Sequence, residues 1–595
     1  MTVALGAIAF KVVDTQAFGG DHYDALAMGQ RTRSVSLAGE RGTIFDRNGN
    51  DLAISLQRQT VFADPSLVED PVHAAKLLAP VLRIDQRSLL VLLTQPDTSF
   101  VYLARKVDNS TAKKVRGLGI PGIGFMEESQ RFNPSGQLAG PVLGFVGSEN
   151  TGLGGLEAAH ESWLAGKAGR VVSEADPSGR PIPATERSEL LAKRGGDLVL
   201  TLDQSLQFEV ESQLVAQVNA TGAKGGMAVV VDIRTGDVLA MATVEGAIEG
   251  TPTQAASARA RNRPLTDIYE PGSTNKVITI ASALEAGIAN PDTTYAVNSS
   301  IWIDDAHFED HDPHGTMQWS VRDILRESSN VGSILIARAV GKDRLDSSLR
   351  EFGFSKKTAI SFPGEAEGLL LDPQDYSESS MGSVPIGLGL AVTPMQMLDV
   401  FVTLANKGVS RPPRLVAAKI DAQGHQVEIP AKRGKRVISA ATAASMVDML
   451  TGVVSGGTGK RAAVPGYTTA GKTGTARKVP YIDKKYMASF AGFAPAEAPR
   501  LAAIVVLDEP VKGYYGGEVA APVFAKVMQY ALRLEHVAPS GAIAVADSAE
   551  QDGSASNDAP PPTTVPTTIP QAPPAPPASA QARATPAGKL ASPDS

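Results

Sequence analysis

The chain has 595 residues, of which 43% are hydrophobic and 20% are charged, so it is too long for one ordinary domain and can fill sizeable cores. Its formal net charge of -7 at pH 7 provides no basic surface for a phosphate backbone, and we expect no nucleic-acid partner. The chain contains no cysteine, which excludes disulfides and thiolate metal sites. This is compatible with an extracytoplasmic location but does not demonstrate one.

The chain begins with a short apolar segment. Residues 2–10 are all apolar or small, and Lys11 and two valines follow before the polar Asp14. A helix needs about 20 residues to cross a bilayer, so this run cannot cross one alone. Two interpretations are open: the outer half of a membrane helix whose start lies outside this numbering, or a short amphipathic segment.

Residues 31–199 have the pattern of a mixed, mostly extended region with turns. Asn48 and Gly49 stand between two apolar runs, which predicts a β-hairpin. A second organised piece extends from Arg131 through the glycine-rich residues 142–157. None of these stretches carries a nucleophile with a partnered base, so we interpret this half of the chain as a binding or spacing module.

A new sheet is predicted to begin after this region. Residues 204–219 have a helical pattern and lead into two apolar runs, at 228–233 and 238–242. The turn residues 234–237 lie between the two runs, which predicts a second hairpin at the start of that sheet.

Ser273 and Lys276 form a Ser-x-x-Lys pair at the expected start of a helix. Pro271 and Gly272 mark a turn just before the pair. Gly287, after the apolar residues of the helix, is placed to end it in a left-handed conformation. Residues three apart on a helix are neighbours, so the Lys276 amine can reach the Ser273 hydroxyl. In the first turn, free backbone N–H groups and the helix dipole favour an alkoxide nucleophile and the oxyanion formed when it attacks a carbonyl.

This spacing is weak evidence by itself, because Ser-x-x-Lys also arises by chance on solvated helix faces. Two further stretches follow it: Ser328 and Asn330 at the end of the helical run 321–326, and the Lys-Thr-Gly-Thr residues 472–475. Ser-x-x-Lys, Ser-x-Asn and Lys-Thr-Gly in this order are the pattern of penicillin-binding proteins and serine β-lactamases. Ser329 stands where that pattern has Asp, which leaves both functional positions of the second motif in place.

Histidines and acidic residues cluster between residues 304 and 314. A metal site is one interpretation of this stretch, and a polar surface loop is the other, which we prefer. The cluster contains His307, His311 and His314 with Asp304, Asp305, Glu309, Asp310 and Asp312.

Helical patterns extend from residue 277 to about residue 405, and strand patterns return at 488–494 and 501–507, close to the strand of Lys472. An antiparallel sheet built from both ends of a domain, with helices between and on its faces, is an α+β fold. After about residue 534 the sequence is dominated by Ala, Ser, Pro and Thr, which predicts a disordered, partly polyproline tail over residues 536–595 without chemistry of its own.

These motifs resemble those of class B penicillin-binding proteins, the monofunctional peptidoglycan D,D-transpeptidases. The resemblance covers residues 31–534 and includes residues 41–49, typical of the class B pedestal, as well as 387–389 and 392–396. Residues 514–524 resemble the end of the transpeptidase domain in division-specific members. The septal type is therefore the most similar.

The resemblance implies a domain organisation. Residues 1–13 would be a partial membrane anchor, 14–200 an elongated N-terminal pedestal (dimerisation-type) domain, and 201–535 a C-terminal penicillin-binding transpeptidase domain. The short apolar N-terminus departs from the family, which has a cytoplasmic leader and a full membrane helix. We expect a single-pass membrane protein with its catalytic domain outside the cytoplasm.

The resemblance also assigns catalytic roles. Ser273 would attack the D-Ala-D-Ala carbonyl, Lys276 would take its proton, and Ser328 would relay a proton to the leaving amine. Asn330 would hold Lys276 and the peptide. An ordinary lysine is protonated at neutral pH, so we expect burial and the like charge of Lys472 to lower the pKa of Lys276.

Substrate binding is assigned to the Lys-Thr-Gly stretch. Thr473 and Thr475, with Lys472, would receive the terminal carboxylate, and Gly474 lies between them. The backbone N–H groups of Ser273 and Thr475 would form the oxyanion hole. We expect neither a metal nor an organic cofactor.

Several alternatives remain for the function. A carboxypeptidase or β-lactamase with the same motifs would finish the reaction with water, an elongation-type transpeptidase would act outside the septum, and a non-catalytic penicillin sensor or scaffold would only bind. The expected partners are stem peptides ending in D-Ala-D-Ala, β-lactams, a membrane-embedded SEDS-family glycosyltransferase and other divisome proteins.

Overall fold

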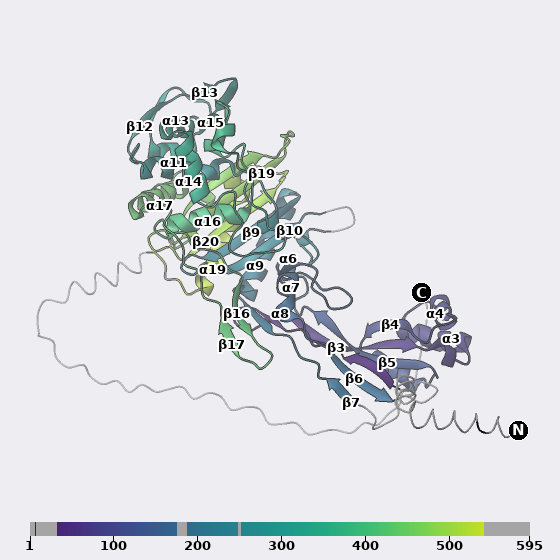
Figure 1. Ribbon diagram of the computed structural model, residues 1–595. Helices are drawn as coiled ribbons and strands as arrows, with labels where there is room; N and C mark the ends of the chain where they lie inside the picture. The colour runs from purple at the N-terminus through teal and green to yellow at the C-terminus, as the bar shows by residue number, and fades with distance from the viewer. Residues whose placement is uncertain (1–5, 7–31, 38, 175–186, 248–251, 541–595) are drawn as a thin grey trace, which may run out of the picture. The chain divides into compact units, whose positions relative to one another are not determined.

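A computed structural model describes residue 6 and residues 32–37, 39–174, 187–247 and 252–540 of the chain (Figure 1). The predicted membrane-anchor segment, apart from residue 6, and residues 541–595 of the predicted tail lie outside the described residues. Among the residues that are described, no helix has the length and apolar character needed to cross a membrane.

A seven-stranded sheet combines five strands of the N-terminal region with two, β16 and β17, from residues 416–428. Its strand order is β17-β16-β8-β2-β3-β4, and β5 pairs with β3 outside this path. The strands are β2 (Ile44–Phe45), β3 (Asp51–Ala63), β4 (Val101–Val107), β5 (Ile123–Phe132), β8 (Asp197–Leu200), β16 (Val416–Ile420) and β17 (Gln426–Glu428). A separate three-stranded sheet has the order β1-β6-β7 and contains β1 (Thr32–Leu37), β6 (Gly169–Glu174) and β7 (Arg187–Leu190).

The predicted hairpin at Asn48 and Gly49 is confirmed as the connection between β2 and β3. Gly49 has a φ of 84°, a conformation that glycine adopts without steric cost. The Asp46 carboxylate accepts backbone hydrogen bonds from Asn48 and Asn50, both at 2.8 Å, and so closes the turn.

Residues 31–199 contain more helices than we predicted, since we expected a mostly extended region there. Three of them, α3 (Pro71–Leu82), α4 (Gln86–Leu93) and α5 (Asn109–Gly117), pack around a core that includes Leu78, Leu89 and Val115. Each begins directly after an aspartate whose side chain accepts a backbone N–H of the first turn: Asp70, Asp85 and Asp108. Such caps satisfy donors that a helix start leaves unpaired. Short helical pieces lie at η1 (Pro65–Leu67), α6 (Gly140–Leu143), α7 (Gly155–Ala159) and α8 (Glu161–Leu164).

The C-terminal region contains a six-stranded antiparallel sheet in the order β11-β10-β9-β20-β19-β18. The predicted α+β fold and the second hairpin are thereby confirmed, and both ends of the region contribute strands. The strands are β9 (Gly225–Asp232), β10 (Val238–Glu245), β11 (Gln254–Ala255), β18 (Ala470–Arg477), β19 (Tyr486–Ala494) and β20 (Leu501–Asp508).

Helices cover both faces of this sheet. Alternate residues of a strand point to opposite faces, and Val230 belongs to the core with α9 (Gln204–Thr221) and α19 (Ala521–Leu534). Val229 belongs instead to the core with α11 (Lys276–Glu285) and α16 (Pro394–Ala405). Figure 1 shows α11, α13, α14 and α17 gathered beside one another on that second side.

The segment between α11 and α16 is less uniformly helical than we predicted. Two small antiparallel pairs, β12 with β15 and β13 with β14, lie within it. Their strands have four residues each, too few to show a clear two-residue period: β12 (Thr294–Val297), β13 (Ser300–Ile303), β14 (Ala306–Glu309) and β15 (Met317–Ser320).

The remaining helices complete this region. They are α10 (Arg263–Thr266), η2 (Gly272–Asn275), α12 (Val321–Glu327), α13 (Asn330–Val340), α14 (Lys342–Glu351), η3 (Pro373–Asp375), α15 (Ser380–Ser383), η4 (Val384–Ile386), α17 (Ala440–Ser455), η5 (Lys460–Ala462) and α18 (Gly516–Val519).

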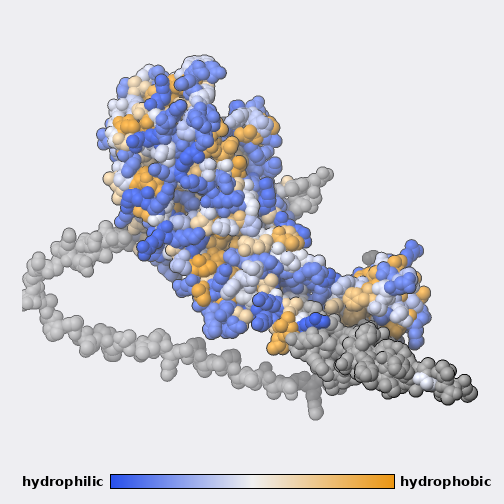
Figure 2. Space-filling view, in the orientation of Figure 1, coloured by the Kyte–Doolittle hydropathy of each residue, from blue (hydrophilic) through white to orange (hydrophobic). Residues whose placement is uncertain are grey.

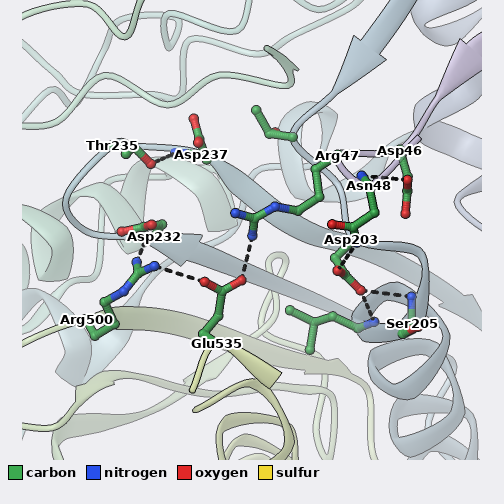
Figure 3. A network of polar contacts seen from close by, with 12 residues as sticks. Asp46, Arg47, Asn48, Asp203, Ser205, Asp232, Thr235, Asp237, Arg500 and Glu535 are labelled. Carbon is green, nitrogen blue, oxygen red and sulfur yellow. Dashed lines mark hydrogen bonds and ion pairs between the residues drawn. The ribbon is translucent and has the colours of Figure 1, made fainter. Parts of the chain in front are cut away.

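A polar network joins the β2–β3 hairpin to the end of α19 (Figure 3). Arg47 in the hairpin pairs with Glu535 at 2.6 Å, and Arg500 pairs with the same carboxylate at 2.9 Å and also with Asp232. Asn48 donates to Asp203, which caps the start of α9. The β2–β3 hairpin is thus bound to the C-terminal region by the ion pair of Arg47 with Glu535 and by the hydrogen bond from Asn48 to Asp203.

The face drawn in Figure 2 is mostly hydrophilic, with small hydrophobic patches scattered over it. Large apolar side chains exposed on the described residues include Phe208, Val427 and Val511. Scattered apolar side chains are normal on a soluble domain.

Candidate active site

A cleft of about 770 Å³ opens beside β18, the edge strand of the six-stranded sheet. Residues of all three sequence motifs line it, including Ser273, Ser328, Asn330, Thr473 and Thr475. Lys276 and Lys472 lie beneath the lining with fully buried side chains. The structure therefore brings the three motifs together in one place.

Ser273 lies in the 3-10 turn η2, three residues before Lys276, where α11 begins. We predicted the first turn of the helix itself, so the prediction is correct in position but not in helix type. The turn is held by Thr274, whose hydroxyl donates to the Pro271 carbonyl at 2.8 Å. Within the described residues, the Ser273 hydroxyl makes no hydrogen bond, and it faces the cleft.

Ser328 and Asn330 sit where α12 ends and α13 begins. Ser328 closes α12 with a left-handed φ of 59°, an uncommon conformation for a residue other than glycine. Ser329 caps α13 by accepting the Gly332 N–H at 2.8 Å. The tight break between the two helices directs Ser328 and Asn330 toward the buried lysines.

The Lys276 ammonium group binds the second motif and not Ser273. Its Nζ donates to the Ser328 carbonyl at 2.5 Å and to Asn330 Oδ1 at 2.7 Å, and it lies 3.3 Å from Ser328 Oγ. Lys472 Nζ donates to the same Ser328 Oγ at 2.9 Å. The predicted role of Asn330 in holding Lys276 agrees with this geometry.

Burial lowers the pKa of both lysines, because it disfavours their charged forms. It lowers the pKa of Lys276 to about 7, and the charge of Asp310 acts in the opposite direction. Burial, helped by the charge of Lys276, lowers the pKa of Lys472 well below its usual range. Burial dominates as expected, but the like charge acts on Lys472 and not, as we predicted, on Lys276.

The Lys-Thr-Gly stretch lies on β18 beside η2, the turn that carries Ser273. A Cβ on Gly474 would stand 2.3 Å from Ser489 Oγ and 2.9 Å from the Pro271 carbonyl oxygen, so this close approach requires glycine. Thr473 shares a hydrogen bond with Thr458 at 2.9 Å, and Thr475 accepts the Gly516 N–H at 3.0 Å. Both threonine hydroxyls are thereby held at the cleft.

Asp310 is a cleft residue that the sequence interpretation assigned to a surface loop. Its carboxylate accepts from Ser329 Oγ at 2.7 Å and from the Val331 N–H at 3.0 Å, and His314 lies 3.0 Å away. The loop after β14 is therefore fixed on the Ser-x-Asn motif. The hydrogen bond to Asp310 raises the pKa of His314.

The other members of this cluster do not converge. His307 pairs with Glu309 at 3.1 Å, and His311 lies against the ring of Tyr515. No group of three or more histidine and acidic side chains is arranged to hold a metal ion in the described part of the chain.

Aromatic side chains form one wall of the cleft. Tyr486 stacks on Tyr514 with ring centroids 4.5 Å apart, and the hydroxyls of Tyr514 and Tyr515 are 2.6 Å apart. Tyr514 and Tyr515 belong to residues 514–524, the stretch that resembles division-specific family members. Nothing in the local pattern indicated that they meet a tyrosine of β19.

Two family models match this chain. Residues 226–529 match the penicillin binding protein transpeptidase domain, and residues 36–200 match the penicillin-binding protein dimerisation domain. The chain belongs to the class B penicillin-binding proteins. As a member of that class, it carries a transpeptidase domain of the kind found in enzymes named peptidoglycan D,D-transpeptidases.

This class B penicillin-binding protein is 35% identical over 531 residues to the peptidoglycan D,D-transpeptidase FtsI of Escherichia coli, covering 86% of each chain. It is 33% identical over 551 residues to the penicillin-binding protein PbpB of Mycobacterium tuberculosis, covering 86% of this chain and 80% of that one.

Solved structures give the same result. A peptidoglycan synthetase from Bifidobacterium adolescentis matches with a TM-score of 0.70 and 28% identity, over 86% of this chain and 98% of that chain. Penicillin binding protein 3 from Mycobacterium tuberculosis, complexed with aztreonam, matches with a TM-score of 0.65 and 29% identity, over 85% and 98%.

Proposed function

We propose that this protein is a serine D,D-transpeptidase that cross-links peptidoglycan stem peptides through an acyl-enzyme at Ser273. The observation that carries the proposal is the pair of buried lysines beneath Ser273 in the cleft, joined by the Ser328 hydroxyl. A lysine with a pKa of about 7 is substantially neutral at physiological pH and can act as a base.

The first half-reaction forms an ester. Ser273 Oγ attacks the carbonyl carbon of the penultimate D-alanine while Lys276 Nζ takes the hydroxyl proton. The C–N bond then breaks, and the terminal D-alanine leaves as an amine. Ser328, which contacts both lysines, passes the proton to that leaving nitrogen.

Two groups of donors support this step. The backbone N–H groups of Ser273 and Thr475 stabilise the oxyanion, as the family resemblance implies. Thr473, Thr475 and Lys472 receive the terminal carboxylate of the substrate, and the open edge of β18 offers backbone partners to an extended peptide. The chemistry requires neither a metal nor an organic cofactor.

The second half-reaction decides between a transpeptidase and a hydrolase. An amine of a neighbouring stem peptide attacks the ester carbon, forms the cross-link and returns the proton to Ser273. Water in place of that amine would give a carboxypeptidase or a β-lactamase. The relatives named D,D-transpeptidases, matched over 86% of this chain, support the amine.

The division-type resemblance supports a role in septal wall synthesis, with elongation as the alternative. We further propose that residues 1–13 are part of a single membrane anchor, that the catalytic domain is extracytoplasmic, and that the partners are a SEDS-family glycosyltransferase and divisome proteins. Localising a tagged copy tests the septal role: a septal band agrees with it, and a uniform side-wall signal contradicts it.

Covalent labelling tests the enzyme assignment. A β-lactam resembles the D-Ala-D-Ala end of the substrate. A solved structure similar to this chain, that of penicillin binding protein 3 from Mycobacterium tuberculosis, is a complex with the β-lactam ampicillin. A competent Ser273 should open the ring and keep it as a slowly hydrolysed ester, visible as a stable mass increase. Wild-type protein that shows no adduct by mass spectrometry would overturn the proposal.

Two variants locate the chemistry. Ser273→Ala should abolish the adduct, and an adduct that persists in this variant would exclude Ser273 as the nucleophile. Lys276→Ala should also prevent acylation although the hydroxyl is still present, because no base remains to take its proton. Unchanged melting temperatures of the variants exclude loss of the fold as the cause.

A further inference from the structure

Glu270, three residues before Ser273, joins three segments of the active site through one oxygen atom. Its Oε1 accepts the backbone N–H of Gly389 at 2.7 Å and the hydroxyl of Tyr481 at 2.9 Å. The side chain is largely buried, since Glu270 is only 8% exposed. A carboxylate in such a place forms stronger hydrogen bonds than a neutral acceptor would.

The first segment that Glu270 contacts supports the nucleophile turn along its whole length. Tyr269 exchanges two backbone hydrogen bonds with Val392, and the Gly272 N–H donates to the Gly387 carbonyl at 3.0 Å. Further along, the Asn275 side chain donates to the Val384 carbonyl at 2.9 Å. Residues 384–392 thus form a support on which the turn of Ser273 rests.

The contact between the turn and this support is very close. A Cβ on Gly387 would stand 2.2 Å from the Gly272 carbonyl oxygen. A small movement of residues 387–389 would therefore move the backbone that carries Ser273. Glu270 fixes the Gly389 end of this contact from within the nucleophile segment itself.

The second segment is the connection between β18 and β19, residues 478–485. Lys478 anchors its beginning through ion pairs with Asp508 at 2.7 Å and Glu509 at 2.8 Å. Tyr481 at its middle is half exposed, and its backbone has a φ of 65°. Such a conformation is unusual for a bulky residue and persists where the surroundings hold it.

The Tyr481 hydroxyl contributes to holding this conformation through its hydrogen bond to Glu270, beside the Tyr481 N–H, which donates to the Lys478 carbonyl at 2.7 Å. Partial burial and the hydrogen bond to Glu270 raise the pKa of Tyr481 to about 12, so the hydroxyl remains a donor at physiological pH. The connection leads directly out of the strand that carries Lys472 and Thr475. One carboxylate therefore ties the nucleophile turn to the chain that leaves the substrate-binding strand.

We propose that Glu270 is a positioning residue for Ser273 and that the hydrogen bond from Tyr481 to Glu270 holds the β18–β19 connection in place. This proposal rests on the proposed function of Ser273 as the nucleophile. Glu270 sets where the hydroxyl stands relative to Lys276 and to β18. Tyr481 sets how firmly residues 478–485 are held against the segment that carries Ser273.

The first test measures acylation by a fluorescent penicillin under saturation. Glu270→Ala removes both hydrogen bonds and should lower the limiting acylation rate roughly tenfold to a hundredfold, since small misplacements of reacting atoms have effects of this order. The penicillin concentration at half-saturation should remain close to the wild-type value. Glu270→Gln keeps an acceptor oxygen and should recover most of the rate.

The outcomes of this test separate positioning from folding. If Glu270→Ala acylates at the wild-type limiting rate, or if only the fraction of active protein falls, Glu270 has no positioning role. Glu351→Gln changes an exposed glutamate at the end of α14; it is the control and should not change the rate. If wild-type protein is not acylated at all, the proposed function fails instead.

The second test uses the rate of trypsin cleavage to measure how firmly the Tyr481 hydroxyl holds the β18–β19 connection. The connection contains Lys484 and Lys485, and Lys484 is exposed. Tyr481→Phe removes only the hydroxyl and should increase the rate of cleavage after these lysines several-fold, as should Glu270→Ala. Tyr530→Phe on α19 is the control. Cleavage of Tyr481→Phe at the wild-type rate would show that the hydroxyl does not hold the connection.

Discussion

The Nζ atom of Lys472 lies 2.9 Å from the Ser328 hydroxyl and donates a hydrogen bond to it. The same hydroxyl is 3.3 Å from Lys276 Nζ, so one small side chain connects two buried amines. Two ammonium ions at this separation in a buried site repel each other. A shared hydroxyl allows a proton to move between them without a change in the net charge of the cleft.

Ser328→Ala should break this connection. We expect the acylation rate to fall about a hundredfold, the scale at which a positioned proton-transfer group contributes. The fold should survive, because losing such a hydrogen bond costs about 1–3 kcal/mol. Penicillin acylation kinetics and thermal melting check both parts. Ser282→Ala removes a buried hydroxyl on α11 that bonds Ser348, and this control should acylate normally.

Acylation should depend on pH through Lys276. Burial lowers its pKa to about 7, and only the neutral amine accepts a proton. The rate should therefore rise about tenfold per pH unit below pH 7 and level off above it. Stopped-flow acylation from pH 5 to 9 measures this profile. A rate that is flat across pH 7 would mean that Lys276 is not the base.

Asp310→Asn should shift this profile to lower pH. The Asp310 charge raises the pKa of Lys276, so its removal lowers the midpoint, and the acylation rate below pH 7 increases relative to its plateau. The plateau itself should fall, since the carboxylate also holds Ser329 and the Val331 N–H. Asp312→Asn makes the same charge change on an exposed neighbour and should leave the midpoint in place.

Gly387→Ala should lower both stability and acylation. Gly387 has a φ of 81°, a region that costs other residues about 1–2 kcal/mol, and the added Cβ would meet the Gly272 carbonyl oxygen. We expect a lower melting temperature and slower penicillin binding. Gly424→Ala tests the conformational part alone, because Gly424 has a φ of 88° with open space around it.

The network around Glu535 should respond unequally to its two arginines. Arg47 is partly exposed, so Arg47→Ala should cost about 1 kcal/mol or less. Arg500→Ala removes the buried cation from Asp232, which keeps the exposed Arg234 guanidinium at 3.8 Å, and should cost about 3 kcal/mol. Chemical denaturation measures both. Equal losses would contradict the difference in burial on which this prediction rests.

The sequence could indicate the candidate active-site residues because their spacing is tied to local structure. A Ser-x-x-Lys pair at a helix start, a Ser-x-Asn between helices and a Lys-Thr-Gly on a strand each have a local signature. The turn at Asn48 and Gly49 was predictable for the same reason, since that dipeptide favours one hairpin geometry.

What the sequence could not provide depends on contacts between distant segments. Asp310 acquires its role by lying against Ser329 and Val331, and no local pattern distinguishes it from the other acidic residues of its loop. Glu270 lies only three residues before Ser273, but its partners Gly389 and Tyr481 are far along the chain. The helices α3 to α5 were different: their capping aspartates were a readable signal that the extended interpretation overlooked.

The pairing of β9 with β20 has a consequence for how the protein is made. Synthesis produces β9 and β10 early, but the other edge of β9 remains unpaired until residues 501–508 emerge. Closing so long a loop is entropically costly and slow. A chain shortened before β20 would contain Ser273, Ser328 and Lys472 and still leave an apolar strand with an open edge, where pairing between molecules begins. Aggregation, more than partial activity, is the expected fate of such fragments.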